Sequence, residues 1–592
     1  MRNKIKNSIE KALKNLGIEA KEVILEHPAD PKMGDYSTNV AMTLGKNLKT
    51  NPARNATPAR NDSRSDSGRH NVAGGPKELA GKIVEEINKN LPTEVERVEA
   101  ASGFINFYLN KYFFQDKVQN IIENKNFGAN DHFSDKKIMI EYTDANPFKP
   151  FHIGHLMTNA IGESVARILE YSGAEVSRAN YQGDVGLHVA KAIWGLLKNP
   201  KLQDKLGDVT LQSNNIGKAY VLGAEVYESD EKAKKEIDEI NKKIYSEGDQ
   251  RINEIYAWGL EATMKAFEDL YRTLGTKFDF YFLESHVAPI GEKIARANIG
   301  KVFEESDGAV VFKAEKHDPK LHTRVFITKA GLPTYEAKEV GLIEDKFKNK
   351  PNLDLSIVIT ANEQVDYMKV VTKAITLLIP EHGNKMTHIA HGMMKFSNGK
   401  MSSRKGNVVT GEMLLRDTKM LVAEKMKDRD FSESEKDKIS SDVGVAALKY
   451  SILKQSIGGD IIFDFDKSIS FEGDSGPYLQ YSYARAKSLL EKGVKENIFP
   501  NFNNLPNEVS GVEKLLYQFP EVVLRSAEES EPHHIANFLI EIARAFNTFY
   551  ALHQIVDKKD VTSPYKLALT EAFSIVLKNG LHLLGIEAPE KM

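Results

Sequence analysis

Short apolar runs alternate with longer amphipathic segments over residues 126–460, and this alternation constrains the fold more than any other feature of the chain. One apolar run spans 137–143 and precedes a periodic segment that begins near His152, and the run 175–181 precedes another. Strands that alternate with helices predict parallel strands joined by helical crossovers. We therefore expect an α/β domain with a doubly wound, Rossmann-like parallel sheet. Further strands are expected at 309–313, 323–327 and 355–360.

The segments on either side predict two further domains. Residues 1–125 mix helical periodicity with short strands, which indicates a small α+β domain. Residues 461–592 are periodic at helical spacing almost throughout, so we expect an all-α helical bundle. In these two domains the expected helices span 3–16, 38–48, 76–90, 478–490, 512–519, 533–554 and 564–584, and the expected strands span 23–25 and 104–109.

Two stretches differ from their surroundings. Residues 51–75 are rich in Asn, Arg, Ser, Ala and Gly, so we expect a disordered surface loop. Its arginines offer a contact to RNA, but a neutral insertion is the simpler interpretation. Residues near 200–275 are mostly helical and highly charged, and they predict a solvated helical insertion within the central domain.

Composition excludes several classes of function. At 592 residues the chain is too long for one core, and its formal charge of −3 means that any contact with nucleic acid must come from a local patch. It contains no cysteine, which excludes disulfides, thiolate nucleophiles and Cys-ligated zinc, and we expect no zinc site. No signal peptide and no apolar run of about 18 residues are evident, so we expect a cytoplasmic protein with no membrane span.

Two histidines follow the first expected strand, in the run His152-Ile153-Gly154-His155. Ligands collect at the carboxyl ends of parallel strands, and the amides at a helix start attract phosphate. Both imidazoles then face the same ligand, and Gly154 lets a nucleotide approach the backbone. Alone, two capping or core histidines would explain this run equally well.

A second short segment, Gly399-Lys400-Met401-Ser402-Ser403-Arg404-Lys405-Gly406, carries three cations and two hydroxyls between glycines. Such a loop is suited to closing on the same phosphates. A solvated Lys/Arg turn would be the simpler interpretation without the histidine run. The order and the spacing of the two segments favour one shared ATP site.

The two segments resemble the HIGH and KMSKS signatures of class I aminoacyl-tRNA synthetases. Residues 144–150 resemble the arginyl-tRNA synthetase version, in which Ser-x-Asn-x-x-Lys-Pro precedes the histidines. Asn146 and Lys149 match that pattern, whereas Asp144 replaces the serine. The resemblance covers nearly the whole chain outside 51–75, through the runs at 34–36, 103–107, 178–186, 331–339, 361–364, 476–485 and 584–592.

An arginine substrate has its own physical requirements. Its guanidinium is always charged and presents a planar fork of donors, so a selective pocket needs carboxylates placed for bidentate pairing. The resemblance implies that Glu284 and Glu339 are these carboxylates and that Tyr335 stacks on the guanidinium. Glu339 stands where Asp is commoner, and an ordinary surface pair would also explain Tyr335 and Glu339. The remaining arginine-binding residues implied are Asn146, Gln364 and Asp144.

The resemblance also implies the ATP site, with Mg²⁺ bound to ATP as substrate. The arginine carboxylate attacks the α-phosphorus and pyrophosphate leaves, so catalysis is positioning and charge stabilisation. The implied catalytic residues are Lys149, His152, His155, Lys400, Ser402, Arg404 and Lys405. The implied ATP-binding residues are His152, Gly154, His155, Gly183, Asp184, Met394, Lys400 and Met401. Ser403 stands where the general signature has its second Lys, so Arg404 or Lys405 takes its place.

In the second step, arginine passes to the 2′-hydroxyl of the terminal adenosine of tRNA(Arg), as the resemblance implies. Single-stranded anticodon bases are recognised by stacking and by hydrogen bonds to their edges. The residues expected to contact tRNA are Tyr478, Gln480, Tyr481 and Arg485, although tyrosines at this spacing are more often part of a core. A monomer is the usual form in the family.

Two alternatives remain open at this point. A class I lysyl-tRNA synthetase also needs carboxylates for its cationic substrate, and a synthetase-like RNA-binding paralogue would lack catalysis. The run around Tyr335 argues against the first, and intact His152, His155, Lys400 and Ser402 argue against the second. A P-loop NTPase is excluded because the chain has no Gly-x-x-x-x-Gly-Lys-Ser/Thr.

Overall fold

The computed structural model describes residues 1–19, 22–49, 75–397 and 410–592. These residues form two compact units. The first contains 1–124, 498–517 and 554–572, and the second contains 125–497, 518–553 and 573–592. Among the described helices, none has the length and apolar character that crossing a membrane requires.

The first unit has a three-stranded antiparallel sheet in the order β1-β3-β2. Its core gathers apolar residues of the helices and the sheet, including Ile5, Leu79 and Phe107. The ring of Tyr517, from the segment 498–517, lies 5.3 Å from that of Phe113, which explains how this distant segment joins the unit. The elements are α1 (Arg2–Asn15), β1 (Tyr36–Thr38), α2 (Val40–Lys49), α3 (Pro76–Asn88), β2 (Val95–Ala101), β3 (Phe104–Leu109), α4 (Lys111–Glu123) and α18 (Gly511–Leu516).

Two expectations for this unit were wrong or incomplete. The strand expected at 23–25 is absent, and only Glu26 forms an isolated bridge, to Ser37. Strand β2 was not expected, because a bulge between Val95 and Arg97 interrupts the alternation of buried and exposed residues by which a strand is recognised.

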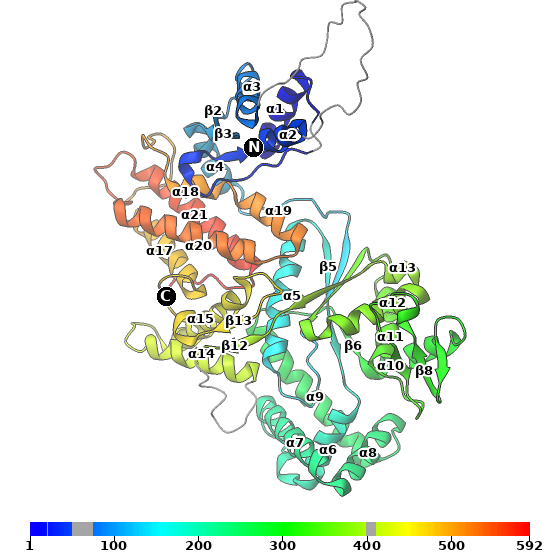
Figure 1. Ribbon diagram of the computed structural model, residues 1–592. Coiled ribbons are helices and arrows are strands. Elements are labelled where there is room, and N and C mark those ends of the chain that lie inside the picture. Colours follow the sequence, from blue (N-terminus) through cyan, green and yellow to red (C-terminus); the bar gives the residue numbers. More distant parts are fainter. Residues whose placement is uncertain (20–21, 50–74, 398–409) are drawn as a thin grey trace, which may run out of the picture. The chain divides into compact units, whose positions relative to one another are not determined.

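The second unit contains a five-stranded, all-parallel sheet in the order β11-β10-β4-β5-β6 (Figure 1). Strands that follow β4 along the chain add first to one side of it and then to the other, as in a Rossmann fold. The order therefore reverses between β4 and β10, and the crevice at their carboxyl ends is where such sheets bind ligands. The strands are β4 (Lys137–Glu141), β5 (Glu175–Gln182), β6 (Phe280–Leu283), β10 (Leu355–Ala361) and β11 (Met386–His391). The prediction of a doubly wound parallel sheet is confirmed.

Two of the expected strands belong to a different sheet. The strands β8 (Ala309–Phe312) and β9 (Arg324–Ile327) lie where strands were expected, but they pair antiparallel with each other and with β7 (Glu304–Ser306). Strands β6 and β11, which were not expected, complete the parallel sheet instead. The helices beside the sheet are α5 (Ile153–Tyr171), α10 (Glu284–Ala297), α11 (Tyr335–Asn349), α12 (Val365–Leu378) and α13 (Pro380–Gly383).

A group of four helices forms the insertion between β5 and β6 (Figure 1). Aspartates at the N-caps of three of them, Asp208, Asp230 and Asp249, accept hydrogen bonds from first-turn amides. Gly195 and Gly223 bring two of the helices into backbone contact, because an added Cβ would lie 2.2 Å and 2.1 Å from opposing carbonyl oxygens. The helices are α6 (Leu187–Lys198), α7 (Val209–Ser229), α8 (Glu231–Ser246) and α9 (Gln250–Thr273).

The C-terminal part of the chain is helical, as expected. A short parallel pair, β12 (Met394–Phe396) and β13 (Ile461–Phe463), lies on its N-terminal side in the sequence. The helix expected at 512–519 is broken into α18 and α19, with Pro520 in the first turn of the latter. The helices are α14 (Gly411–Lys425), α15 (Glu433–Leu453), α16 (Phe465–Ser468), α17 (Gly476–Lys495), α19 (Phe519–Glu529), α20 (His533–Leu552) and α21 (Ser563–Leu583).

Candidate active site

The two predicted histidines cap helix α5 and cap each other. His155 N–H donates to Nδ1 of His152 at 3.3 Å, and His152 N–H donates to Nδ1 of His155 at 3.2 Å. The two rings are stacked, with centroids 3.4 Å apart. Since each Nδ1 accepts an amide hydrogen, each neutral ring carries its own proton on Nε2.

Both imidazole rings are held in their neutral form, in which they can donate hydrogen bonds to phosphate without carrying a charge. Burial, together with His152 and the Lys149 ammonium, lowers the pKa of His155 well below its ordinary value. Burial and Lys149 lower the pKa of His152 to about 4, and its ring keeps an exposed edge. At neutral pH both rings are therefore uncharged Nε2–H donors.

The turn from β4 to α5 uses backbone conformations that side chains seldom adopt. Thr143, Asp144 and Phe148 have φ values of 80°, 50° and 65°. Tyr181 N–H donates to the Asp144 carboxylate at 2.9 Å, and Phe148 packs so tightly on Gly259 of α9 that an added Cβ there would lie 2.3 Å from its ring. The surrounding structure thus holds a strained turn at the ligand-binding edge of the sheet.

The second signature cannot be placed directly. Lys400, Met401, Ser402, Arg404 and Lys405 lie outside the described residues. The first described residue after them, Thr410, forms a backbone bridge with His152. Gly411 N–H donates to the Phe151 carbonyl at 2.8 Å, and a Cβ on Gly411 would lie 2.8 Å from the Phe151 ring. The described chain therefore resumes, at Thr410 and Gly411, directly beside the first signature.

Carboxylates gather at the same edge of the sheet, and three of them have cationic partners. Glu141 pairs with Lys346 at 2.5 Å, and both side chains are almost fully buried. The other pairs are Glu284 with Lys338 at 2.6 Å and Glu336 with Arg324 at 3.5 Å.

Two further carboxylates, Asp144 and Glu339, have no ion-pair partner among the described residues. Burial and the neighbouring Glu141 raise the pKa of Asp144 well above its ordinary value and raise that of Glu339 to about 8. Both carboxyls therefore favour the protonated form, and a cation that bound beside them would release their protons.

Asn146 and Gly183 link the β4–α5 turn to this carboxylate cluster. Gly183 N–H donates to Asn146 Oδ1 at 2.7 Å. A Cβ on Gly183 would lie 2.6 Å from Asn146 Oδ1 and 3.1 Å from Glu284 Oε1. The absence of a side chain at Gly183 thus lets two predicted arginine-binding residues lie side by side.

Asp184 does not have the position expected of an ATP ligand. It is fully buried, and its carboxylate accepts hydrogen bonds from Ser285 N–H, Ser285 Oγ and Tyr256 OH at 2.9, 2.6 and 2.9 Å. These bonds fix the first turn of α10, which carries Glu284. The expectation of direct ATP contact is corrected to a positioning role.

The remaining predicted residues are less closely connected. Tyr335 is 62% exposed, and its ring centroid lies 4.9 Å from Lys338 Nζ. Gln364 is exposed just after β10, at the carboxyl end of that strand. Met394 begins β12 and pairs with Ile461. Within the described part of the chain, no hydrogen bond joins Gln364 or Met394 to the carboxylate cluster.

The sequence argument missed four residues that complete this cluster. Lys338 and Lys346 neutralise two of the carboxylates, and the hydroxyls of Tyr181 and Tyr367 are buried without a hydrogen-bond partner. Lys338 follows Tyr335 by three residues, and that helical spacing was the one available signal. Lys346, Tyr181 and Tyr367 were not predictable, because the four residues lie on three separate elements, α11, β5 and α12, and share no local pattern.

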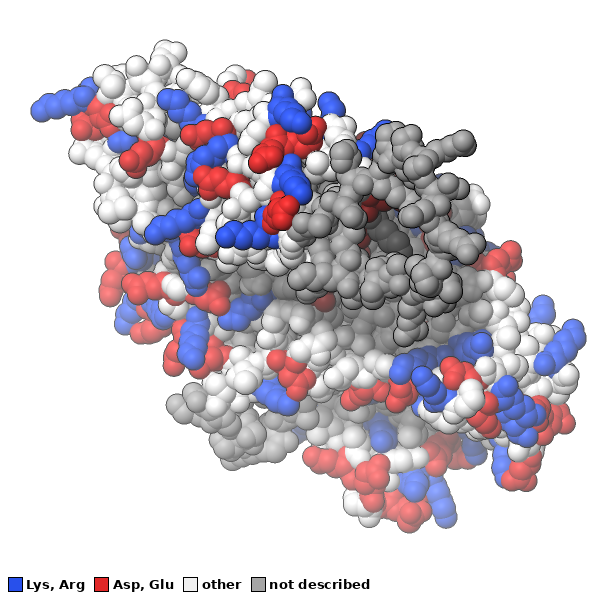
Figure 2. All heavy atoms as spheres, turned by 45° about the horizontal axis from the view of Figure 1, so that its top comes forward, with Lys and Arg blue, Asp and Glu red and all other residues white. Residues whose placement is uncertain are grey.

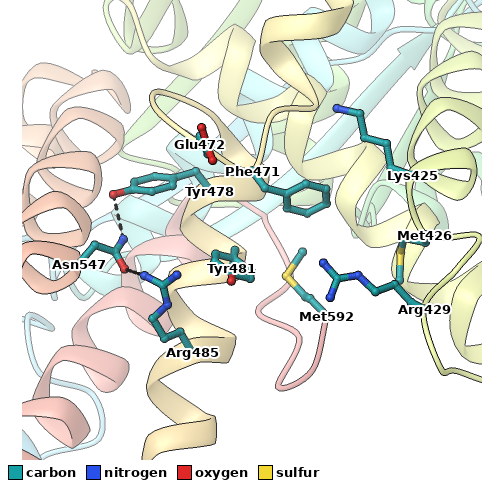
Figure 3. A pocket seen from close by; sticks show the side chains of 10 residues that line it. All are labelled: Lys425, Met426, Arg429, Phe471, Glu472, Tyr478, Tyr481, Arg485, Asn547 and Met592. Carbon is teal, nitrogen blue, oxygen red and sulfur yellow. Dashed lines mark hydrogen bonds between the residues drawn. The ribbon is translucent and has the colours of Figure 1, made fainter. Parts of the chain in front are cut away.

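Helix α17 contributes to a cavity of about 380 Å³ in the second unit (Figure 3). Asn547 joins two of its lining residues, since it accepts a hydrogen bond from Arg485 and donates one to Tyr478 at 2.9 Å. The Arg485 guanidinium also lies over the ring of Tyr481, 4.8 Å from its centroid. The lining residues are Lys425, Met426, Arg429, Phe471, Glu472, Tyr478, Tyr481, Arg485, Asn547 and Met592.

Gln480 does not join the other residues predicted to contact tRNA. Its side chain is fully buried, and Nε2 donates to the carbonyls of Glu587 and Asp442 at 2.8 and 3.3 Å. A direct RNA contact is therefore not available to Gln480. Gln480 lies on the opposite side of helix α17 from Tyr478. Tyr478 therefore lines the cavity, whereas Gln480 stabilises the C-terminal segment through Glu587.

Charges on the described surface are interspersed. On the face shown in Figure 2, Lys and Arg side chains alternate with Asp and Glu side chains over most of the described surface. This pattern agrees with the formal charge of −3. Any RNA-binding surface therefore depends on local features such as the Arg485 cavity.

Comparisons with known proteins agree with this geometry. A family model described as "tRNA synthetases class I (R), catalytic domain" matches residues 117–465. Two others, "DALR anticodon binding domain" and "Arginyl tRNA synthetase N terminal domain", match 479–592 and 3–109.

Individual relatives match along most of their length. An arginine–tRNA ligase of Clostridium perfringens is 29% identical over 599 residues, which cover 100% of this chain and 98% of that protein. One of Clostridium acetobutylicum is 31% identical, with 86% of this chain and 90% of that protein covered. The fold is similar to a solved structure of Thermus thermophilus arginyl-tRNA synthetase, with a TM-score of 0.76 at 22% identity and 100% of both chains covered. The chain therefore belongs to the arginyl-tRNA synthetase family of class I aminoacyl-tRNA synthetases.

Proposed function

We propose that the chain activates L-arginine with ATP to give arginyl-adenylate and pyrophosphate, and then transfers arginine to the terminal adenosine of tRNA(Arg). Its family is that of the arginine–tRNA ligases, which are ATP-dependent enzymes. One observation carries the proposal. The bridge between His152 and Thr410 joins the start of α14 to the first signature at the switch point of the sheet, beside a cluster of buried carboxylates.

In the first step, an oxygen of the arginine carboxylate attacks the α-phosphorus of ATP, and the bond from that phosphorus to pyrophosphate breaks. The chain supplies donors rather than a nucleophile. His152 and His155 each offer a neutral Nε2–H to phosphate oxygens, and Lys149 adds a cation beside them. Donors that are fixed before the reaction stabilise the charge that develops on the phosphate.

The second signature and Mg²⁺ would also contribute to the activation of arginine. Lys400, Ser402, Arg404 and Lys405, with Met401, would bind the same phosphates from the second signature, and Gly154 and Met394 would lie beside the nucleotide. Mg²⁺ enters bound to ATP, as part of the substrate, and neutralises phosphate charge.

The carboxylate cluster supports arginine as the amino acid. Glu284 and Glu339 would pair with the guanidinium, and Tyr335 would cover it. Asn146 and Gln364 would hold the α-amino and carboxylate groups. Asp144, which replaces the serine of the family pattern, adds a carboxylate on the Asn146 side of the site and would attract the α-ammonium.

In the second step, the 2′-hydroxyl of the terminal adenosine attacks the arginyl carbonyl, and AMP leaves. The cavity beside Arg485 would receive an unstacked anticodon base between Tyr478 and Tyr481. We propose the division into an N-terminal domain (1–125), a catalytic domain (126–460) and an anticodon-binding domain (461–592). We further propose that a monomer acts in the cytoplasm, where tRNA is charged.

Attachment of labelled arginine to tRNA(Arg) tests the proposed function. We expect charging that requires ATP and arginine, with no charging by lysine. A chain that binds tRNA but charges it with no amino acid would instead be a non-catalytic paralogue. Charging of a lysine tRNA would identify the other alternative, which the family match does not favour.

A further inference from the structure

Lys338 contacts two of the residues that are proposed to bind the guanidinium of arginine. Its Nζ donates to Glu284 Oε2 at 2.6 Å, and it lies 4.9 Å from the centroid of the Tyr335 ring. The side chains of Lys338 and Glu284 are each only 6% exposed. An ion pair so well shielded from water depends strongly on the presence of both charges.

The backbone leaves this pair little freedom to separate. Helices α10 and α11 touch through two glycines, because a Cβ on Gly291 would lie 1.8 Å from the Ala337 carbonyl and one on Gly341 would lie 2.1 Å from the Val287 carbonyl. Asp184 fixes the first turn of α10 through Ser285. Glu284 and Lys338 are therefore held opposite each other by two packed helices.

The two oxygens of Glu284 have different surroundings. Among the described residues, hydrogen bonds to this carboxylate reach only Oε2, which Lys338 occupies. Oε1 lies 3.1 Å from the position of a Cβ on Gly183, next to Asn146 Oδ1. Oε2 is thus bound by Lys338, and Oε1 faces the residues that are proposed to bind arginine.

We propose that Lys338 is a positioning residue for arginine recognition, which keeps the Glu284 carboxylate ionised and directs its free oxygen toward the guanidinium. The inference rests on the proposed function and adds a residue to it. A guanidinium has only donors, so a protonated Glu284 would present a hydrogen toward it instead of an acceptor. Lys338 prevents that state without contacting the substrate.

Electrostatics supports the geometry. Burial raises the pKa of Glu284, and the Lys338 ammonium opposes that rise. Without Lys338, the carboxylate would stay buried beside other acids, and its pKa would rise further. The groups that face Glu284 are Lys338 and Glu339 on α11, Asp184 after β5, Lys149 before α5, and the hydroxyls of Tyr181, Tyr245, Tyr335 and Tyr367.

The test compares Lys338→Met, Lys338→Arg and a control, Lys348→Met, in arginine-dependent ATP–pyrophosphate exchange with tRNA(Arg) present. Lys348 is exposed on the same helix. At pH 7 we expect Lys338→Met to raise the KM for arginine about tenfold or more and to leave the KM for ATP unchanged. Lys338→Arg should restore the KM, and Lys348→Met should match the unmodified enzyme.

The pH dependence separates this role from a merely structural one. The ratio of the two arginine KM values, Lys338→Met over unmodified, should shrink between pH 7 and pH 9 as Glu284 ionises. If Lys338→Met fails to fold, Lys338→Gln gives the same comparison, because it too removes the charge. An equal or lower KM for arginine would overturn the proposal, since Lys338 would then be neutral to the substrate or compete with it.

An unchanged KM for arginine in the Lys338→Met variant can be told apart from a failure of the proposed function. An unmodified enzyme that shows no response to arginine would overturn both proposals. An unmodified enzyme that responds to arginine, with a Lys338→Met variant that responds equally well at every pH, would overturn only the role of Lys338.

Discussion

Thr410 forms a backbone bridge with His152, so the helix that follows the second signature starts at the first signature. These two residues are separated by more than half of the catalytic region in sequence, and the parallel sheet brings them together. The bridge holds the start of α14 beside the histidines that are proposed to bind ATP. The chemistry proposed for the site depends on it.

His155→Ala should lower turnover far more than arginine binding. Its Nε2–H is proposed to donate to phosphate oxygens, where charge increases in the transition state, whereas arginine is proposed to bind at the carboxylate cluster. Steady-state exchange measures both quantities. The variant also loses a cap of α5, which costs about 1 kcal/mol of stability. His155→Asn controls for that loss, because its amide oxygen can accept the same backbone hydrogen. Equal losses in turnover and arginine binding would contradict the role.

Gly183→Ala should weaken arginine binding by about tenfold or more. The added methyl would lie 2.6 Å from Asn146 Oδ1 and 3.1 Å from Glu284 Oε1, so both side chains must move. Calorimetric titration with arginine measures the effect. Gly248→Ala, in which the methyl would meet only the flexible Ser246 side chain, is the matched control. Unchanged arginine affinity would show that Asn146 and Glu284 do not act together on the substrate.

Arginine binding should release a proton at neutral pH. Burial and Glu141 raise the pKa of Glu339 to about 8, so the free enzyme holds it protonated at pH 7, and the guanidinium favours the ionised form. Arginine affinity should therefore rise between pH 6 and pH 8, by up to about tenfold per pH unit. Titrations in buffers of different ionisation enthalpy count the released protons.

The Glu339 carboxyl also makes the free energy of unfolding depend on pH. Its folded-state pKa lies above the ordinary value of 4.5, so its stabilising contribution is complete below that value and is lost as pH rises through 8. Glu339→Gln should remove both the proton release and most of the arginine affinity. A variant that still released the proton would assign the titration to Asp144.

The sequence predicted the parts of this site that lie in continuous runs. The strand, turn and helix around His152 lie where they were expected. Local patterns determine such features, because strand and helix periodicities are properties of short segments.

Pairing between distant segments was not predictable in the same way. Strands β8 and β9 were located correctly but assigned to the wrong sheet, because an antiparallel excursion has the same local pattern as a strand of the main sheet. Asp184 and Gln480 were taken for ligand contacts, although their partners, Ser285 and Glu587, lie about a hundred residues away in sequence. The reciprocal cap of His152 and His155 and the positive φ values of Thr143 and Asp144 were likewise not indicated by the residue types there.

Tyr481→Ala should raise the KM for tRNA(Arg) and leave arginine-dependent exchange at saturating tRNA unchanged. Base stacking on an aromatic ring contributes about 1–3 kcal/mol, so an increase of about tenfold or more is expected. Arg485 lies over this ring and would lose that contact, although it keeps its hydrogen bond to Asn547. Tyr112→Ala, an exposed tyrosine of the first unit, is the control. A normal KM for tRNA would place the anticodon elsewhere.

Arginine-dependent ATP–pyrophosphate exchange tests the central claim most directly, with lysine as the competing amino acid and with tRNA(Arg) present and absent. We predict label incorporation into ATP that requires arginine and tRNA(Arg), and that Glu284→Gln reduces strongly. Exchange that responds to lysine but not to arginine would contradict the assignment of the carboxylate cluster as an arginine site.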